Sequence, residues 1–477
     1  MTINTLDLLR RLGEIVGPRG LLDAAADMEP YEADWRNLRR GRALCVLRPD
    51  GTDAVARCVR LCAEAGVPIV PQGGNTSMVD GATPDDSGRQ VVLSLARLNR
   101  IRAIDTVDMT MTLDAGVTVK AAQDSAAEAG CTFPLSFSAE GSATIGGALS
   151  TNAGGNYTIR FGNTRDLMLG LEVVLPDGRI WNGLRALRKD NTGYTLRHLF
   201  AGAEGTLGII TGAVIKLVPM MRSEELMFCG VTDPDAALRL YRRFRTADEM
   251  SLRAFEYLSG TAVDLAVRNI EGVVLPLASR SEHYVLVDLA STRADGLRAL
   301  AESVLSEAFE AGDVGDAVIA DSLAQRGALW RLREEQSDAQ KRAGANVKND
   351  VSVPVSRGPD LIRLATEAVE RLIPGVRSAP FGHMGDGNIH LNFVKPEGSD
   401  DGAFLARSGE LTEAVNAVVR ELGGSFSAEH GVGRLKVDTM ADWRAGPELD
   451  LMHAIKTAID PRGLLNPGKV LKAPAIG

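Results

Sequence analysis

At 477 residues, the chain is long enough for more than one hydrophobic core. Its 62 acidic residues outnumber the 53 basic ones, and the net charge of -9 disfavours nucleic-acid binding, which needs a basic face. No apolar run is long enough to span a bilayer, and the first residues predict an amphipathic surface helix instead of a signal peptide. Because the five cysteines form no CxxC pair, we expect reduced thiols and a cytoplasmic protein.

Residues 43–77 predict two short strands joined by a helix and followed by a glycine-rich loop. The apolar run that begins at residue 43 stops at Pro49, and residues 52–65 carry apolar side chains at helical spacing. A second buried strand, residues 67–70, runs directly into the loop PQGGNTS. The loop at the end of such a strand is where an α/β sheet usually binds its ligand.

Two glycine-rich loops together predict a site for a large anionic cofactor. The first spans residues 71–81, and the second, residues 138–156, holds five glycines, several hydroxyls and two asparagines. One such loop is more often a tight turn, but two donor-rich loops favour binding along a diphosphate. The donors expected in the first loop are the backbone at Gly73 and Gly74 and the side chains of Asn75, Thr76 and Ser77.

Two common nucleotide-binding motifs are excluded. No G-x-G-x-x-G occurs anywhere in the chain, so a nicotinamide-type fold has no support. The stretch GLLNPGKV at residues 463–470 resembles a P-loop but ends in Val470 where Ser or Thr is required. Too little chain follows it to build the helix that a P-loop needs.

Half of the six histidines lie in two short glycine-flanked stretches, FGHMGDGNIHLNF and SAEHGVGRLK. A glycine turn can fold His383 back beside His390, and the carboxylate of Glu429 would complete a His₂Glu set. Such a set binds Zn²⁺ and leaves positions open for substrate. A lone histidine is more often structural, but these ligand types in such loops favour a metal site. His430 follows Glu429, and a neutral imidazole there could take a proton from a substrate hydroxyl.

The order of these motifs resembles the flavin-dependent 2-hydroxyacid dehydrogenases of the vanillyl-alcohol oxidase superfamily. The resemblance covers about residues 34–471 and includes HLFAGAEGTLGIIT and LLNPGKV besides the stretches above. Within that group, Asp34-Trp35-Arg36, the GGNTS loop and HLN after the histidine loop are most similar to the D-2-hydroxyglutarate-oxidising branch.

The resemblance implies an α+β fold in three parts. These are a vanillyl-alcohol-oxidase-type FAD-binding domain at residues 1–220, an α/β substrate (cap) domain at residues 221–424, and a C-terminal segment, residues 425–477, that returns to the FAD domain. No histidine precedes His198, so we expect non-covalent FAD. A carboxylate would repel the diphosphate, so Asp80 is expected to point to solvent. The loops and the resemblance assign the FAD contacts to Gln72, Gly73, Gly74, Asn75, Thr76, Ser77, Gly141, Ser142, Ile145, Gly146, Asn152, Gly154, Gly155, Glu204, Gly208, Ile209 and Asn466.

The resemblance also implies roles for residues near the histidines. It makes His383, His390 and Glu429 the metal ligands and His430 the catalytic base. Residues 329–341 predict one helix with Arg333 and Ser337 one turn apart. The substrate's distal carboxylate is assigned to Arg333, Ser337 and Lys348, and Asn392 is expected to orient the substrate.

The predicted reaction is FAD- and zinc-dependent oxidation of a D-2-hydroxy acid, D-2-hydroxyglutarate to 2-oxoglutarate, by proton abstraction and hydride transfer to flavin N5. D-lactate or glycolate dehydrogenase or oxidase activity of the same family stays open. A flavin-free zinc hydrolase would leave both glycine loops unexplained, and a binding protein without chemistry would not need the Glu429-His430 pair. An electron-transfer flavoprotein or a quinone is the expected electron acceptor, and a homodimer is the expected assembly.

Overall fold

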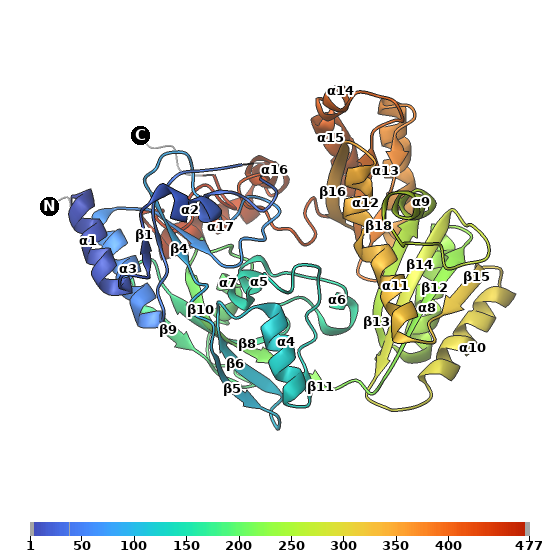
Figure 1. The fold of residues 1–477 in the computed structure, drawn as a ribbon, viewed down its shortest axis with the longest axis horizontal. Helices are drawn as coiled ribbons and strands as arrows, with labels where there is room; N and C mark the ends of the chain where they lie inside the picture. Colours follow the sequence, from blue (N-terminus) through green and yellow to red (C-terminus); the bar gives the residue numbers. More distant parts are fainter. Residues whose placement is uncertain (1–3, 38, 473–477) are drawn as a thin grey trace. The chain divides into compact units, whose positions relative to one another are not determined.

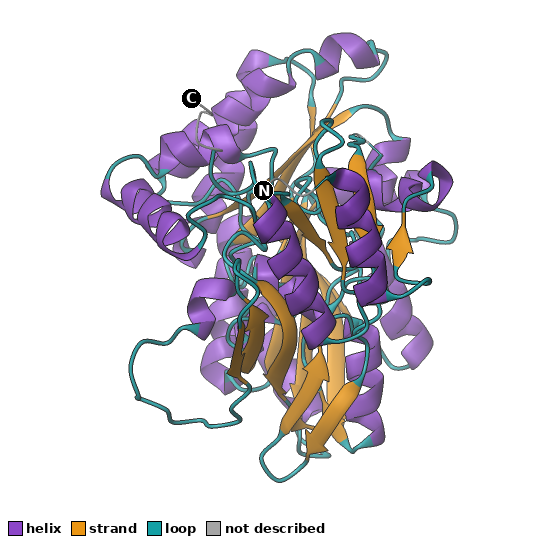
Figure 2. Cartoon of the chain, turned by 90° about the vertical axis from the view of Figure 1, so that its left-hand side faces the viewer, coloured by secondary structure: helices purple, strands orange, loops and turns teal. Residues whose placement is uncertain are grey.

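A computed structural model of the chain describes residues 4–37 and 39–472. The chain forms two compact units; one comprises residues up to Gly154, Gly162–Met220 and His430 onward, and the other Gly155–Phe161 and Met221–Glu429. The borders expected from the sequence were residues 220 and 424. Helices and strands alternate in both units, which confirms the α+β class (Figure 1, Figure 2). None of the described helices is long and apolar enough to cross a bilayer.

The first unit begins with the predicted strand–helix–strand segment. It forms β2 (Ala43–Leu47), α3 (Thr52–Ala65) and β3 (Ile69–Gln72). Both strands pair in parallel with β4 (Gln90–Ser94), and α3 ends at Gly66, whose φ of 71° suits glycine. The remaining elements around this sheet are α1 (Thr5–Val16), β1 (Leu21–Leu22) and α2 (Ala25–Glu32).

A second sheet of the first unit is antiparallel and carries a helix that forms within the second glycine-rich stretch, residues 138–156. That helix, α5 (Ile145–Thr151), packs on the central strand β10 (Ile209–Lys216). Gly146 also lets α5 approach Ala115 closely, because a Cβ at Gly146 would lie only 2.7 Å from the Cβ of Ala115. The sheet order is β5 (Ile101–Asp105), β6 (Thr110–Asp114), β10, β8 (Met168–Val174) and β9 (Ile180–Gly183). Smaller elements are α4 (Val119–Glu128), β7 (Cys131–Thr132), α7 (Arg197–Phe200) and β11 (Val218–Pro219).

The C-terminal segment returns to the first unit, as expected. It contains α16 (Val437–Trp443) and α17 (Pro447–Ile459) and lies beside the N-terminal elements, red beside blue in Figure 1. The N–H of Ile69 donates to the carbonyl of Leu464 at 2.8 Å, and the N–H of Asn466 donates to the carbonyl of Ile69 at the same distance. Residues 464–466 therefore lie along the edge of β3, directly before the first glycine loop.

The second unit is built on one large sheet with helices on it. Its strand order is β15 (Val314–Ile319), β12 (Ser223–Val231), β14 (His283–Ser291), β13 (Leu252–Ser259), β18 (Phe381–Gly382), β19 (Asn388–Val394) and β16 (Asn346–Ser352), with β17 (Arg377–Ser378) also paired to β19. The helices are α6 (Thr158–Phe161), α8 (Pro234–Asp248), α9 (Gly260–Asn269), α10 (Leu297–Glu310), α11 (Leu323–Glu334), α12 (Gln336–Arg342), η1 (Val355–Arg357), α13 (Gly358–Leu372), α14 (Asp401–Leu405) and α15 (Ser408–Glu421).

One face of this sheet is covered by α9, α11 and α12. Leu258 of β13, Leu286 of β14 and Phe381 of β18 pack there against Leu329 of α11 in a single buried cluster. Successive side chains of a strand alternate between faces, so Glu256 points to the same covered face as Leu258. A charged side chain that is buried on that face needs an oppositely charged or hydrogen-bonding partner. The partners of Glu256 are His383 and Arg333, which belong to the candidate site.

Candidate functional site

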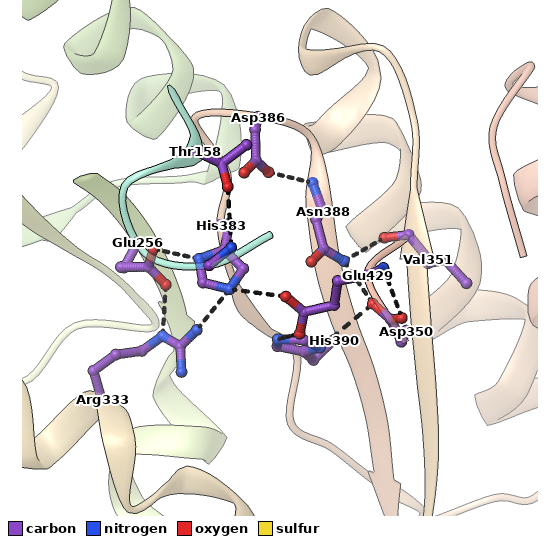
Figure 3. Close-up of polar contacts among 11 residues, drawn as sticks. Thr158, Glu256, Arg333, Asp350, Val351, His383, Asp386, Asn388, His390 and Glu429 are labelled. Carbon is purple, nitrogen blue, oxygen red and sulfur yellow. Dashed lines mark hydrogen bonds and ion pairs between the residues drawn. The ribbon is translucent and has the colours of Figure 1, made fainter. Parts of the chain in front are cut away.

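The three predicted metal ligands come together in the second unit (Figure 3). His383 follows β18, His390 lies within β19, and Glu429 lies beyond α15. One ligand atom from each lies within 4.8 Å of the others. The strands bring them together because β18 pairs with β19 at Phe381 and His390, and a tight turn between the strands carries His383.

The spacing of these atoms suits a metal ion better than direct hydrogen bonds. The Nε2 atoms of His383 and His390 lie 3.9 and 3.6 Å from the two carboxylate oxygens of Glu429. Hydrogen bonds between nitrogen and oxygen are shorter, about 2.7–3.2 Å. Donor atoms about 2.1 Å from a tetrahedral Zn²⁺ lie about 3.4 Å from one another. The donor set therefore fits zinc in both chemistry and spacing.

A buried glutamate that the sequence analysis missed supports His383. Glu256 is 1% exposed; its Oε1 lies 2.7 Å from Nδ1 of His383, and its Oε2 accepts from Nε of Arg333 at 2.6 Å. Burial would raise the pKa of Glu256, but His383 and Arg333 together lower it to about 2. The one signal in the sequence was a single acid inside the apolar strand LRAFEYLS.

Asp350 is a second missed acid, on the His390 side of the cluster. Its Oδ2 accepts from the N–H of Glu429 at 3.1 Å, and its Oδ1 accepts from the Asn388 amide at 2.9 Å. Asp350 and His390 are also direct partners across β16 and β19, with 3.9 Å between Oδ1 and Nδ1. The loop that carries Glu429 is therefore attached to the strand next to His390.

The two imidazoles have different electrostatic surroundings. Burial lowers the pKa of His390 to about 4, which leaves that ring neutral. Burial alone would also lower the pKa of His383, but the carboxylate of Glu256 raises it to about 9. Burial raises the pKa of Asp386, in the turn between the two histidines, to about 6.

The predicted substrate-binding residues are only partly gathered around this cluster. Arg333 is buried, and its Nη2 lies 3.5 Å from Nε2 of His383. Lys348 is exposed and lies directly across from Asn392, on the strand next to it. Asn392 donates to Gln340 at 2.8 Å, and its buried Oδ1 accepts no hydrogen bond from any described residue. An unsatisfied buried acceptor is suited to a ligand donor.

Ser337 departs from the expected single helix. The helix is interrupted at Glu335, so Arg333 lies in the last turn of α11 while Ser337 lies in α12. Ser337 is exposed whereas Arg333 is 8% exposed, so the two do not share one environment. The buried residues of α12 that face the sheet are instead Gln336, Ala339 and Gln340.

The first glycine loop offers a row of free backbone donors. Within the part of the chain that the structure describes, no N–H group of residues 73–77 donates a hydrogen bond. Asn75 has a φ of 53°, which turns the backbone so that successive N–H groups can converge on an anion. A Cβ at Gly74 would lie 1.9 Å from the carbonyl oxygen of Ser142, so the two glycine loops touch. These features fit a diphosphate.

The polar side chains of the two loops mainly hold the loops in shape. Gln72 donates to the carbonyls of Tyr31 and Ala82. Asn75 donates to the carbonyl of Ala33, and the Ser77 hydroxyl accepts from two N–H groups of its own loop. Asn152 caps α5 in a left-handed conformation and accepts from the N–H of Arg165. Of the remaining predicted FAD contacts, Thr76, Gly141, Ser142, Gly154 and Gly155 lie in the loops, and Ile145 is buried at the start of α5.

Asp80 is buried, so the expectation that it points to solvent is wrong. Its side chain is 1% exposed, accepts from the hydroxyl of Thr83, and pairs with Arg434 at 3.4 Å. Burial raises its pKa, which the nearby Lys469 and Arg434 oppose. The ammonium of Lys469 donates to the carbonyl of Thr83 at 2.7 Å, and burial lowers its pKa to about 7. Cations from the C-terminal segment therefore compensate the acid.

Glu204 fixes the turn that follows His430. Its carboxylate accepts from the N–H groups of Val432 and Gly433 at 2.7 and 2.8 Å, and Asn466 donates to its carbonyl. Burial raises the pKa of Glu204, an effect that the two N–H groups oppose. The other residues predicted near the flavin follow it: Gly208, where a Cβ would lie 2.6 Å from Val173, and the buried Ile209 at the start of β10.

Replacing Glu204 by alanine is expected to destabilise the first unit. The change leaves two buried N–H groups without an acceptor, at a cost of about 2–4 kcal/mol in the free energy of unfolding. Urea denaturation measures this difference, and Glu204→Gln, which keeps one acceptor oxygen, should lose about half as much. Glu128→Ala, on the exposed surface of α4, is the control; equal stability of the two alanine variants would contradict this role.

His430 is the first residue of the segment assigned to the first unit, and it directly follows Glu429 of the second. Because the two residues are neighbours in the chain, the imidazole of His430 stays one residue from a candidate metal ligand. The turn after it depends on glycine: Gly431 has a φ of 77°, and a Cβ there would lie 2.7 Å from the Glu204 carboxylate.

Comparison with known proteins finds relatives along nearly the whole chain. Residues 220–470 match the family of FAD linked oxidases, C-terminal domain, and residues 43–183 match an FAD binding domain. The chain is 35% identical to D-2-hydroxyglutarate dehydrogenase of Xanthomonas citri pv. viticola, over 94% of this chain and 93% of that protein. It is 36% identical to the mitochondrial D-2-hydroxyglutarate dehydrogenase of Bos taurus, over 98% and 83%. Among solved structures, substrate-bound p-cresol methylhydroxylase is similar in fold, with a TM-score of 0.72 and 16% identity over 98% of this chain and 97% of that one.

Proposed function

Because the chain belongs to the FAD-dependent D-2-hydroxyacid dehydrogenases of the vanillyl-alcohol oxidase superfamily, we propose that it oxidises D-2-hydroxyglutarate to 2-oxoglutarate with the help of zinc. FAD-dependent oxidation of a D-2-hydroxy acid is the activity of this family of relatives. The observation that carries the proposal is the meeting of a His₂Glu set with a buried arginine, since Nη2 of Arg333 lies 3.5 Å from Nε2 of His383.

The chemistry divides between the cofactors and the side chains. When bound, FAD supplies the hydride acceptor at N5, and zinc, held by His383, His390 and Glu429, supplies a Lewis acid for the substrate's carboxylate and hydroxyl. His430 takes the hydroxyl proton, as a neutral imidazole can near neutral pH.

The substrate is held by side chains of three elements. The terminal N–H groups of Arg333 bind the distal carboxylate, since a guanidinium binds a carboxylate with two parallel hydrogen bonds. Lys348 adds a point charge from the strand next to Asn392. The unsatisfied Oδ1 of Asn392 orients the substrate, and the exposed Ser337 is the least supported member of the set.

The substrate assignment predicts a selective loss in Arg333→Ala. Wild type should prefer D-2-hydroxyglutarate and D-malate to D-lactate by about two orders of magnitude in kcat/KM, because D-lactate leaves a buried cation unpaired. Arg333→Ala should lose most of that preference and leave the D-lactate rate almost unchanged. Steady-state kinetics with an artificial dye as acceptor measures all three acids.

Arg331→Ala is the matched control, because Arg331 lies two residues earlier on α11 but is exposed, where it pairs with Glu335 and donates to the carbonyl of Glu271. It should change no substrate preference. If wild type turns over D-lactate or glycolate best, the dicarboxylate assignment is wrong, and the enzyme belongs to another branch of the same family.

The physiological electron acceptor we propose is an electron-transfer flavoprotein or a quinone, with a homodimer as the assembly. The cytoplasmic compartment expected from the sequence also stays a prediction. It agrees with the five cysteines, all of which are buried and free of disulfides.

A further inference from the structure

Glu256 lies outside every motif of the sequence, yet it contacts a proposed metal ligand and a proposed substrate-binding residue at once. One carboxylate oxygen lies 2.7 Å from Nδ1 of His383, and the other lies 2.6 Å from Nε of Arg333 (Figure 3). We propose that Glu256 is a positioning residue that holds the His383 ring ready for the metal and the Arg333 guanidinium ready for the substrate. The inference rests on the proposed function and names a further residue on which that function depends.

The contact with His383 determines which ring nitrogen can bind a metal. A carboxylate only accepts hydrogen bonds, so the proton of a neutral His383 ring must lie on Nδ1 when Glu256 occupies that side. Nε2 then carries a lone pair and no proton, and it lies 3.9 Å from the Glu429 carboxylate and 3.5 Å from Nη2 of Arg333. Metal-binding histidines almost always donate their second nitrogen to such an acceptor, which fixes both tautomer and ring orientation.

The contact with Arg333 fixes the guanidinium in place. The Nε of Arg333 donates to Glu256, and the guanidinium carbon lies 4.9 Å from the centre of the Phe381 ring. With Nε engaged, the two terminal nitrogens stay available for a substrate carboxylate. One of them lies 3.5 Å from Nε2 of His383, so the proposed metal and substrate positions are adjacent and share one support.

Few side chains can support both neighbours, and glutamine is not one of them. If the amide oxygen of glutamine faces His383, its NH₂ group meets the Nε–H of Arg333, and two donors oppose each other. If the amide is flipped, NH₂ meets Nδ1 of His383, and the ring proton must move to Nε2, where it blocks the metal. Glu256→Gln should therefore weaken zinc binding by about 10- to 100-fold.

The second unit contains a matched control for a buried acid. Asp288 of β14 is 0% exposed and accepts from Arg253 and Arg326, each at 3.0 Å to Oδ1, so it supports two arginines where Glu256 supports a histidine and an arginine. Asp288→Asn thus removes a buried charge from the same sheet and disturbs both of its partners. If the loss of a buried acid weakened zinc binding only by disturbing the structure, Glu256→Gln and Asp288→Asn should weaken it equally.

The experiment measures the zinc dissociation constant of the FAD-loaded enzyme by competition with a chelator. Glu256→Gln is expected to raise this constant by about 10- to 100-fold and also to raise KM for D-2-hydroxyglutarate. Asp288→Asn should leave the constant within about twofold of wild type, even if its melting temperature falls.

Each outcome decides a specific point. Wild type that binds no zinc would refute the proposed metal, and with it this inference. Wild type that binds zinc no more tightly than Glu256→Gln would overturn the inference alone. If Glu256→Gln does not fold, Glu256→Asp replaces it, because it keeps the charge on a shorter side chain that cannot reach both neighbours. Weaker zinc binding by Glu256→Asp then supports the role, and unchanged zinc binding with unchanged KM overturns it.

Discussion

His390→Ala and His383→Ala are expected to abolish turnover and zinc binding while FAD stays bound. Loss of a ligand removes the Lewis acid, which should lower kcat/KM by at least about three orders of magnitude, or about 4 kcal/mol. FAD should remain, because the predicted loop at residues 71–81 and most of the loop at residues 138–156 belong to the first unit, whereas the two histidines belong to the second. Metal analysis, flavin absorbance and steady-state rates on one preparation measure the three quantities.

His453→Ala is the control for these variants, since His453 is exposed on α17 of the first unit. It should keep zinc, FAD and rate. Normal rates of wild type after exhaustive chelation would refute the metal role, as would full zinc content in both histidine variants. Variants that lose FAD together with zinc would contradict the expected separation of the two sites.

His430→Asn is expected to separate proton removal from metal binding. It should keep zinc and FAD but lose about two to four orders of magnitude in kcat, the usual contribution of a positioned general base. Glu204 holds the turn through the N–H groups of Val432 and Gly433, which the substitution leaves in place, so the loop should keep its position. The measurement is kcat together with zinc content.

His453→Asn is the control, because it makes the same substitution at an exposed histidine of the first unit. If His430→Asn also loses its zinc, His430 acts as a ligand and the base must be another group. If it keeps zinc and full activity, the proton is removed without His430.

The order of residues along the chain was enough to recognise the candidate metal site. His383 and His390 flank a glycine turn, and Glu429 lies in a second glycine-flanked stretch, so ligand chemistry and backbone freedom were visible together. The turn folds back because β18 pairs with β19. Local sequence therefore carried the information on this part of the site.

The burial of Asp80 is a feature that the local sequence predicted wrongly. Because a carboxylate would repel the diphosphate predicted at the first glycine loop, Asp80 was expected to point to solvent. The structure buries it, because Arg434 and Lys469 arrive from the far end of the chain, and Lys469 donates to Thr83 across 386 positions. Nothing in the sequence of residues 71–81 predicts that Arg434 and Lys469 lie beside Asp80 in the folded chain.

Residue types and local spacing sufficed for the two glycine loops and the histidine cluster, and the family resemblance that these motifs carry implied the α+β class. The residues of each motif lie close together in the sequence, so the motif can be read without knowing how the rest of the chain folds. Glu256 meets His383 across 127 positions, and Arg333 meets Glu256 only because α11 covers that face of the sheet. Such contacts depend on strand order, which brings distant parts of the sequence together. A buried acid in the low-dielectric interior needs a hydrogen-bond or charge partner, and the tertiary structure determines which residue becomes that partner.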